Sequence, residues 1–133
     1  MIEKMLSDAE YEMVTYYGGG RSLYALWDSW ENSESQSFET RRDTFVWILE
    51  RLLREGRIKL HKNGVFWNSP IDEQIETFRN GFPISERDAD ERCTKPGAEP
   101  AYEGVGMNVW WFLDICPAGV AWREVDGSYA IAD

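Results

Sequence analysis

The segment FETRRDTFVWILERLLREG, residues 38–56, constrains the fold most, because its apolar residues recur at helical spacing along its whole length. One face carries Phe38, Phe45, Ile48, Leu49, Leu52 and Leu53. Charged residues fill the positions between them. Gly56 follows at the position where a helix commonly ends in a residue of left-handed conformation. The spacing therefore predicts an amphipathic helix over these residues.

Two shorter helices are expected before it. The pattern SDAE, with Ser7 and Glu10 three positions apart, is that of a capping box. It predicts a helix to about Tyr17, which the glycines at 18–20 end. The segment SLYALWDSWE, residues 22–31, places two leucines and two tryptophans on one face and predicts a second helix.

After residue 56 the period of the apolar residues changes. RIKL and VFW flank HKNG, and the pair Asn63-Gly64 is a strong signal for a tight hairpin turn. Ser69 is then expected to cap a helix with Pro70 at its first position. Gly81 and a following proline end that helix.

The C-terminal part is strand-like. NVWWFLDI, GVAWREV and SYAIA are joined by Cys-Pro-Ala and by Asp126-Gly127, the second of which is another hairpin signal. Together with the pair at 57–67, this makes up to five short antiparallel strands, mostly C-terminal. The predicted fold is α+β, with N-terminal helices packed on a small antiparallel β-sheet in a single domain, residues 1–133.

The net charge of −10 is unevenly distributed. Residues 1–66 hold 11 acids and 9 bases, a balance of −2, whereas residues 67–133 hold 13 acids and 5 bases, a balance of −8. This asymmetry argues against nucleic acid as a direct partner, since phosphate contacts need Lys and Arg. It is compatible with a basic protein partner, although for an acidic domain in general a charge that only maintains solubility is favoured.

The expected location is the cytoplasm. No apolar run reaches the ~20 residues of a membrane span, so no membrane contact is predicted. The N-terminus has no secretory signal pattern, and two cysteines are too few for a disulfide scaffold.

No residue pattern points to catalysis, a metal or a cofactor. His61 is the only histidine, and it is expected to be solvated beside the hairpin turn. Cys116 lies in a short connection between predicted strands, where a small apolar role is favoured over thiol chemistry. The tryptophan-rich stretch 110–122 is interpreted first as hairpin core, second as an interface and only third as a thiol site. The irregular, acidic stretch 84–107 is the first candidate for a binding surface.

Three segments, FVWILERLLREGRIKLHKNGVFW, SPIDEQIETFRNGFP and WWFLDICPAGVAWREVDG, together resemble a family of small uncharacterised bacterial proteins. The shared pattern is a helix ending in Leu-Leu and Glu-Gly, a basic strand, an Asn-Gly turn, a Phe-Pro helix end and a late hairpin. It covers roughly residues 38–127. Its signature positions are interpreted as core, caps and turns: Leu52, Leu53, Gly56, Phe82, Pro83, Cys116, Pro117, Gly119 and Trp122.

The resemblance implies a genetic context. Similar proteins are encoded beside secreted toxins of contact-dependent growth inhibition, where the small downstream gene encodes the immunity protein. This implies a non-enzymatic protein that binds and neutralises the C-terminal domain of a cognate toxin, of a kind that is often a basic nuclease. The expected contacts are acids with tryptophan anchors: Glu86, Asp88, Asp90, Glu91, Glu99, Glu103, Trp30, Trp67 and Trp111.

Two other classes stay open. One is a small-molecule-binding or enzymatic domain with an aromatic-lined cleft that uses Cys116 or a pair of carboxylates. The other is a homo-oligomeric structural protein that buries its surplus aromatic side chains against a copy of itself.

Overall fold

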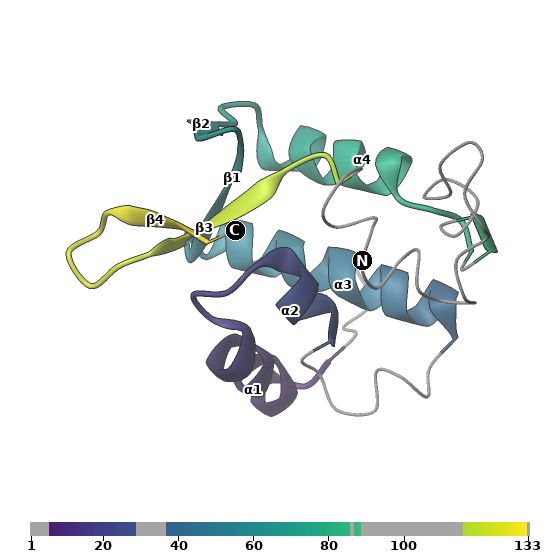
Figure 1. Ribbon diagram of the computed structural model, residues 1–133. Coiled ribbons are helices and arrows are strands. Elements are labelled where there is room, and N and C mark those ends of the chain that lie inside the picture. The colour runs from purple at the N-terminus through teal and green to yellow at the C-terminus, as the bar shows by residue number, and fades with distance from the viewer. Residues whose placement is uncertain (1–5, 29–36, 86, 89–115, 133) are drawn as a thin grey trace, which may run out of the picture.

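The computed structural model describes residues 6–28, 37–85, 87–88 and 116–132, and it confirms the predicted α+β class (Figure 1). The elements are α1 (Asp8–Gly18), α2 (Leu23–Asp28), α3 (Phe38–Arg54), β1 (Ile58–Lys62), β2 (Val65–Phe66), α4 (Ile71–Gly81), β3 (Gly119–Arg123) and β4 (Tyr129–Ala132). Within this described part, no helix combines the length and the apolar character that crossing a bilayer demands.

The first helix begins as its sequence predicts. The Ser7 hydroxyl accepts from the Glu10 N–H at 3.1 Å, and the Glu10 carboxylate accepts from the Ser7 N–H at 3.1 Å. This reciprocal pair satisfies two backbone donors that the first turn leaves free. Helix α2 follows as a short segment, and the rest of the second predicted helix lies outside the described residues.

The long helix α3 is confirmed at both ends. The Ser37 hydroxyl accepts from the Thr40 N–H at its start. At its end Gly56 adopts φ 71°, which a residue with a side chain rarely adopts. The N–H of Gly56 donates to Leu53 and that of Arg57 to Leu52, so the last carbonyls of the helix are satisfied.

The turn between β1 and β2 is also confirmed, with φ 53° at Asn63 and φ 84° at Gly64. The start of α4 differs from the prediction by one residue. Pro70 has ψ 149° and is the cap, not the first helical residue, and no side chain caps the helix. Ser69 contributes its carbonyl instead, which accepts from the Gln74 side-chain amide at 2.8 Å.

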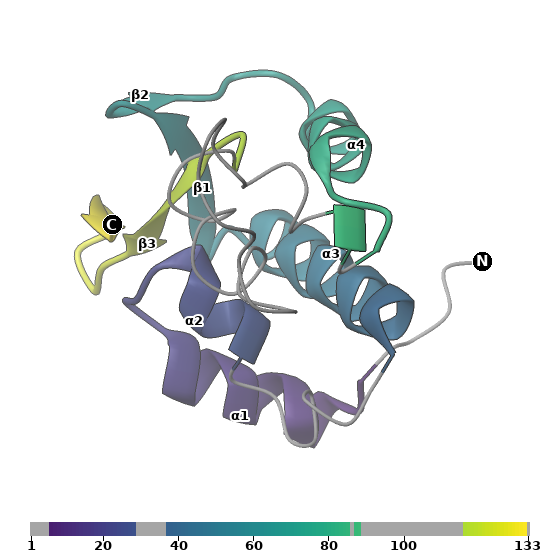
Figure 2. The ribbon, with the colours of Figure 1, turned by 45° about the vertical axis from the view of Figure 1, so that its right-hand side comes forward.

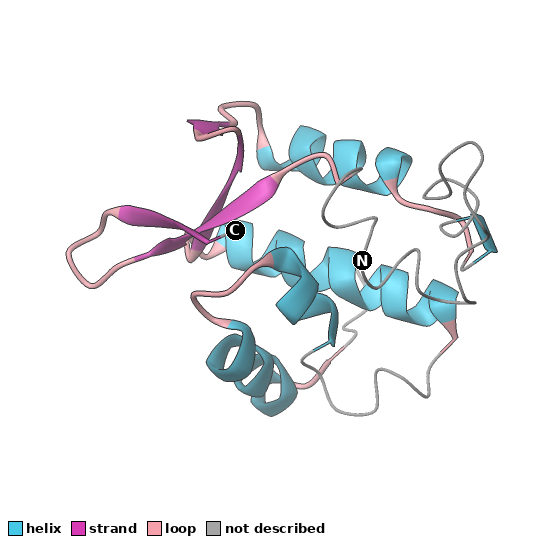
Figure 3. Cartoon of the chain, viewed as in Figure 1, coloured by secondary structure: helices cyan, strands magenta, loops and turns pink. Residues whose placement is uncertain are grey.

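The four described strands form one antiparallel sheet in the order β2-β1-β3-β4, at one end of the molecule (Figure 3). Because β1 and β4 occupy both edges of β3, the hairpin predicted across Cys-Pro-Ala at 116–118 is wrong. Its other predicted strand, 108–115, lies outside the described residues. The hairpin signal at Asp126-Gly127 is confirmed, since these residues lie in the loop between β3 and β4.

The inner face of the sheet turns toward the helices (Figure 2). Its side chains join a core that all four helices complete, with Trp27 packed edge-on against Phe45 at 5.8 Å between ring centroids. The strand residues in this core are Ile58, Leu60, Val120 and Trp122.

The outer face is enclosed by the curl of the sheet. The rings of Phe66 on β2 and Tyr129 on β4 lie 6.4 Å apart, although two strands separate them. Lys59 lies between, with its Nζ 4.5 Å from the Tyr129 ring centroid and 5.5 Å from that of Phe66. This cover buries Ala121 in the middle strand completely.

Candidate protein-binding surface

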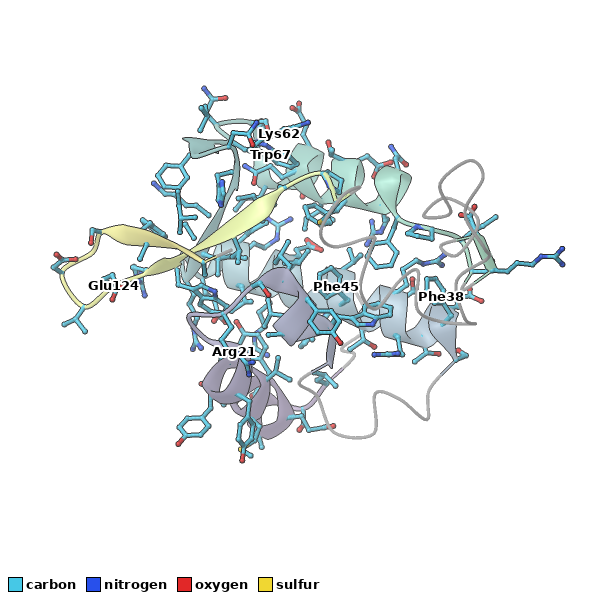
Figure 4. All side chains as sticks on the ribbon, in the orientation of Figure 1. Arg21, Phe38, Phe45, Lys62, Trp67 and Glu124 are labelled. Carbon is cyan, nitrogen blue, oxygen red and sulfur yellow. The ribbon has the colours of Figure 1, made fainter. Side chains whose placement is uncertain are left out.

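Most of the contacts predicted from the sequence lie outside the described residues. These are Glu86, Asp90, Glu91, Glu99, Glu103, Trp30 and Trp111. The two that are described, Asp88 and Trp67, both have roles inside the chain. The Asp88 carboxylate accepts from the Ile84 N–H at 3.0 Å, and the Asp88 N–H donates to the Ser85 hydroxyl. Trp67 is partly buried beside Phe78, which leaves less of its ring for a partner (Figure 4).

Cys116 has the structural character expected of it. Burial raises the pKa of its thiol to about 12, and the thiol donates a hydrogen bond to the Ala118 carbonyl at 3.2 Å. The thiol is therefore protonated at neutral pH, whereas a nucleophile or metal ligand requires the thiolate.

His61 is a correction to the sequence prediction, because it is buried and not solvated. Only 3% of it is exposed, and its Nδ1 accepts from the Gly64 N–H at 3.2 Å. The side chain thus stabilises the hairpin turn from the inside of the curled sheet. Among the described residues, no group of three or more His, Cys, Asp or Glu side chains is placed to hold a metal ion.

An exposed surface with large apolar side chains lies on α1 instead. Tyr11, Val14 and Gly18 face the core, which leaves the other side of the helix to solvent. That side, called here the α1 surface, carries Asp8, Glu10, Glu12, Met13, Tyr16 and Tyr17. Tyr16 is 79% exposed, and Met13 and Tyr17 are each more than half exposed. Tyrosine offers a large contact area at a low entropic cost, which is why it is frequent in interfaces.

The acids of this surface are anchored by two arginines. Arg51 contacts Asp8 at 3.2 Å and Glu55 at 3.0 Å, and Arg57 contacts Glu12 at 2.9 Å. Arg51 also stacks over the Tyr11 ring at 3.9 Å, and the Tyr11 hydroxyl donates to Glu55 at 2.9 Å. These contacts hold α1 against the end of α3 and the start of β1.

The charges of this network remain negative in sum. Three carboxylates, those of Asp8, Glu12 and Glu55, contact the two arginines, a formal balance of −1. Glu10, whose carboxylate accepts from the Ser7 N–H, adds a further negative charge at the start of α1. Burial raises the pKa of Glu55, but the hydrogen bonds from Arg51 and Tyr11 outweigh it and hold this pKa below its usual value. Burial and the bond to Glu55 raise the pKa of Tyr11 well above its usual value. At neutral pH the carboxylate is charged and the phenol is neutral.

An open groove of about 860 Å³ lies between α1 and the end of β3. Its α1 side holds Glu12, Met13 and Tyr16, and its strand side holds Trp122, Arg123 and Glu124. The Trp122 indole N–H donates to the Arg21 carbonyl at 2.8 Å, which ties the loop after α1 to β3. In Figure 4 the labelled Arg21 and Glu124 mark this loop and the start of the β3–β4 loop.

None of the α1 surface residues is among the contacts predicted from the sequence. A signal was present, because a helix that buries Tyr11, Val14 and Gly18 must direct Tyr16 and Tyr17 elsewhere. Sequence alone does not show which of the apolar and aromatic residues of this helix are buried, because all of them are suited to a core.

Comparisons with known proteins place the chain among uncharacterised proteins. A family model described as "Protein of unknown function, DUF596" matches residues 53–131. No curated protein matches the chain. Among solved structures, an uncharacterised protein conserved in bacteria from Neisseria meningitidis is similar, with 23% identity and a TM-score of 0.66. The match covers 91% of this chain and 85% of that one, and it supports a shared fold.

Proposed function

The chain belongs to the DUF596 family of proteins of unknown function, and we propose that it is an immunity protein of a contact-dependent growth inhibition system. In this proposal it binds and neutralises a cognate cytosolic toxin domain. It acts by occupying the toxin and performs no chemistry of its own. The α1 surface and the groove beside it are the contact region in the described part of the chain.

The observation that carries the proposal is the exposed pair Tyr16 and Tyr17 next to an acidic helix start. Large aromatic side chains on a surface provide the apolar centre of many interfaces, and surrounding charges select the partner. Within α1 there are three acids, Asp8, Glu10 and Glu12, and no base. Such a surface fits a basic protein and repels nucleic acid.

Four arginines of the chain strengthen this argument. Arg42, Arg51, Arg54 and Arg57 each contact a carboxylate of the chain itself. A protein that binds phosphates needs arginines that are available to them. A basic nuclease as the partner agrees with this charge pattern, because acids of the immunity protein occupy the place of the phosphates. The acids predicted at 86–103 extend the same negative character and remain part of the proposal.

The test is calorimetry of the whole chain against the C-terminal domain of a toxin encoded immediately upstream. We expect tight binding that weakens with salt and that abolishes toxicity. The double variant Tyr16→Ala/Tyr17→Ala should bind at least about 30-fold more weakly, since a hot-spot aromatic contributes about 2 kcal/mol or more. Its matched control is Val65→Ala/Ile84→Ala, which also removes two exposed apolar side chains but lies away from α1.

A second pair of variants tests whether the predicted acids bind the toxin at specific positions or act only through the net charge of the chain. Glu86→Lys/Glu91→Lys should weaken binding, while Glu73→Lys/Glu76→Lys on α4 makes the same change of charge elsewhere. Equal effects of both pairs would show that only net charge matters. If the upstream domain does not bind at all, the immunity proposal is removed.

The groove supports one other candidate, a small-molecule site. A volume of about 860 Å³ is in the range of ligand pockets, and Trp122 and Tyr16 supply aromatic lining. Arg123, on the strand side of the groove, would favour an anionic ligand. A thermal shift with anionic metabolites that Arg123→Gln abolishes would favour this candidate over the first.

A further inference from the structure

We infer that the outer edge of β4 is a docking site for an extended segment of a basic protein, which adds a strand to the sheet. The inference deepens the proposed function, on which the identity of the partner rests. The pairing itself depends only on the edge strand and can be tested without a toxin.

The hydrogen-bond pattern shows which backbone groups of β4 are available. The Arg123 N–H donates to the Arg57 carbonyl on the β1 side, whereas the Glu124 N–H donates to Ser128 on the β4 side. Because antiparallel pairing alternates, Ala130 and Ala132 bond to β3, and Tyr129 and Ile131 direct their N–H and C=O groups outward. No other described strand lies on that side.

This edge lacks the features that normally protect one. Edge strands are usually interrupted by a charge, a proline or a bulge, which prevent pairing with another chain. The sequence of β4 is Tyr-Ala-Ile-Ala, its register with β3 is continuous, and Ile131 is 48% exposed. The opposite edge, β2, is only two residues long. The available edge is therefore β4.

The position of β4 also leaves room for a partner. The β3–β4 hairpin projects beyond the helices, and β4 is its outer strand (Figure 1). On the outer face, side chains of an added strand would meet Tyr129 and Ile131. On the inner face Ala130 and Ala132 are small, so a larger apolar side chain fits beside them.

The charges decide between a second copy and a different protein. Close to β4 the charges balance, because the exposed acids Glu124 and Asp126 in the loop are matched by Arg123 opposite Tyr129 and by Lys59 beside its ring. The net charge of −10 of the whole chain therefore discriminates, because two copies paired along β4 would repel each other, whereas a basic protein is attracted. The occupant is therefore an extended segment with alternating basic and apolar residues from a basic protein.

The experiment uses the full chain, isotope-labelled, and a synthetic peptide of alternating lysine and valine with blocked ends. We expect the amide signals of Tyr129 and Ile131 to shift in NMR spectra and their hydrogen exchange to slow. A peptide of alternating glutamate and valine should bind much more weakly. The variant Ile131→Pro removes an outward N–H and no bond to β3, so it should abolish the effect. The variant Ile131→Ala keeps that N–H and should retain it.

Three results would overturn the inference. The first is binding of the peptide to Ile131→Pro with unchanged strength, and the second is a set of shifts confined to other elements. The third is a dimer of the free chain that Ile131→Pro dissociates, which would make a second copy the occupant. If Ile131→Pro does not fold, the slowed exchange of the two amides in the unaltered chain still decides.

The same variants separate this inference from the proposed function. If the toxin domain binds Ile131→Pro as tightly as the unaltered chain, the function stands and the edge plays no part in it. If the peptide pairs with β4 but no toxin domain binds, the edge stands and the immunity proposal fails.

Discussion

The α1 surface and the β4 edge flank the same end of β3 but offer a partner different chemistry. On α1 the carboxylates of Asp8 and Glu12 are already paired with Arg51 of α3 and with Arg57 before β1, so a partner would meet exposed side chains such as Tyr16. On β4 the backbone groups of Tyr129 and Ile131 are directed outward. Side-chain contacts discriminate between partners, whereas backbone pairing tolerates many sequences. Specificity is therefore expected from α1 and additional affinity from β4.

The two regions are also held in the fold by different means. Helix α1 is anchored through one buried aromatic ring and the arginines around it. Strand β4 is anchored through its ladder to β3 and through the Tyr129 hydroxyl, which donates to the Gly56 carbonyl at 2.7 Å. Substitutions that remove one anchor at a time test this difference.

The largest effect is expected from Tyr11→Ala. This ring is fully buried, packs edge-on against Trp47 at 5.9 Å and lies under Arg51. Its removal should lower the free energy of unfolding by about 3–5 kcal/mol, as for other large aromatic truncations. Urea denaturation measures the change. Tyr16→Ala, on the exposed side of the same helix, should stay within about 0.5 kcal/mol. Equal losses in the two variants would disprove the assigned faces of α1.

The sequence predicts the locally encoded parts of this fold well. The capping box at Ser7, the end of α3 at Gly56 and the turn at Asn63-Gly64 each depend on a few adjacent residues, and each is confirmed. The predictions that failed depend on residues far apart in the sequence. The pairing of β1 with β3 leaves no free edge of β3 for the hairpin predicted across 116–118, and the curl of the sheet buries His61. Neither feature produces a pattern among neighbouring residues of the sequence.

The candidate site was less predictable for the same reason. Acid content correctly indicates a negative chain, but it does not show which acids are used internally. Asp88 illustrates this, since its carboxylate accepts from the Ile84 backbone. The exposure of Tyr16 follows from the side of α1 that faces α3 and β1, which is a property of the packed helices.

A proline scan of β4 distinguishes its two sides. Ala130→Pro removes an N–H that bonds to β3 and leaves the opposite carbonyl without its partner, at a cost of about 1–3 kcal/mol. Ile131→Pro removes an outward N–H and should cost less, mainly through the lost contacts of the Ile131 side chain. Thermal or urea denaturation compares the two. A larger loss for Ile131→Pro would mean that the assignment of outward groups is reversed.

Tyr129→Phe isolates the hydroxyl anchor of β4. The ring contacts with Lys59 and Phe66 are retained, and only the hydrogen bond to Gly56 is lost. We expect a loss of about 0.5–1.5 kcal/mol, the usual net value of such a bond. Faster hydrogen exchange confined to β4 would show that this bond holds the edge strand. An unchanged stability and exchange rate would show that the ladder to β3 suffices.

The smallest effect is expected from Glu55→Gln, and it depends on pH. The folded state holds the pKa of Glu55 below its usual value, so its contribution to stability is fully present above that value. It is lost as the pH falls from about 4.3 through the lower, folded-state pKa. The glutamine variant lacks this titration and should show a flatter acid limb in urea denaturation. Since about a third of the side chain is exposed, at 34%, solvent screening keeps the difference small. An identical acid limb in both proteins would mean that the arginines hold α1 through their stacking on Tyr11 rather than through Glu55.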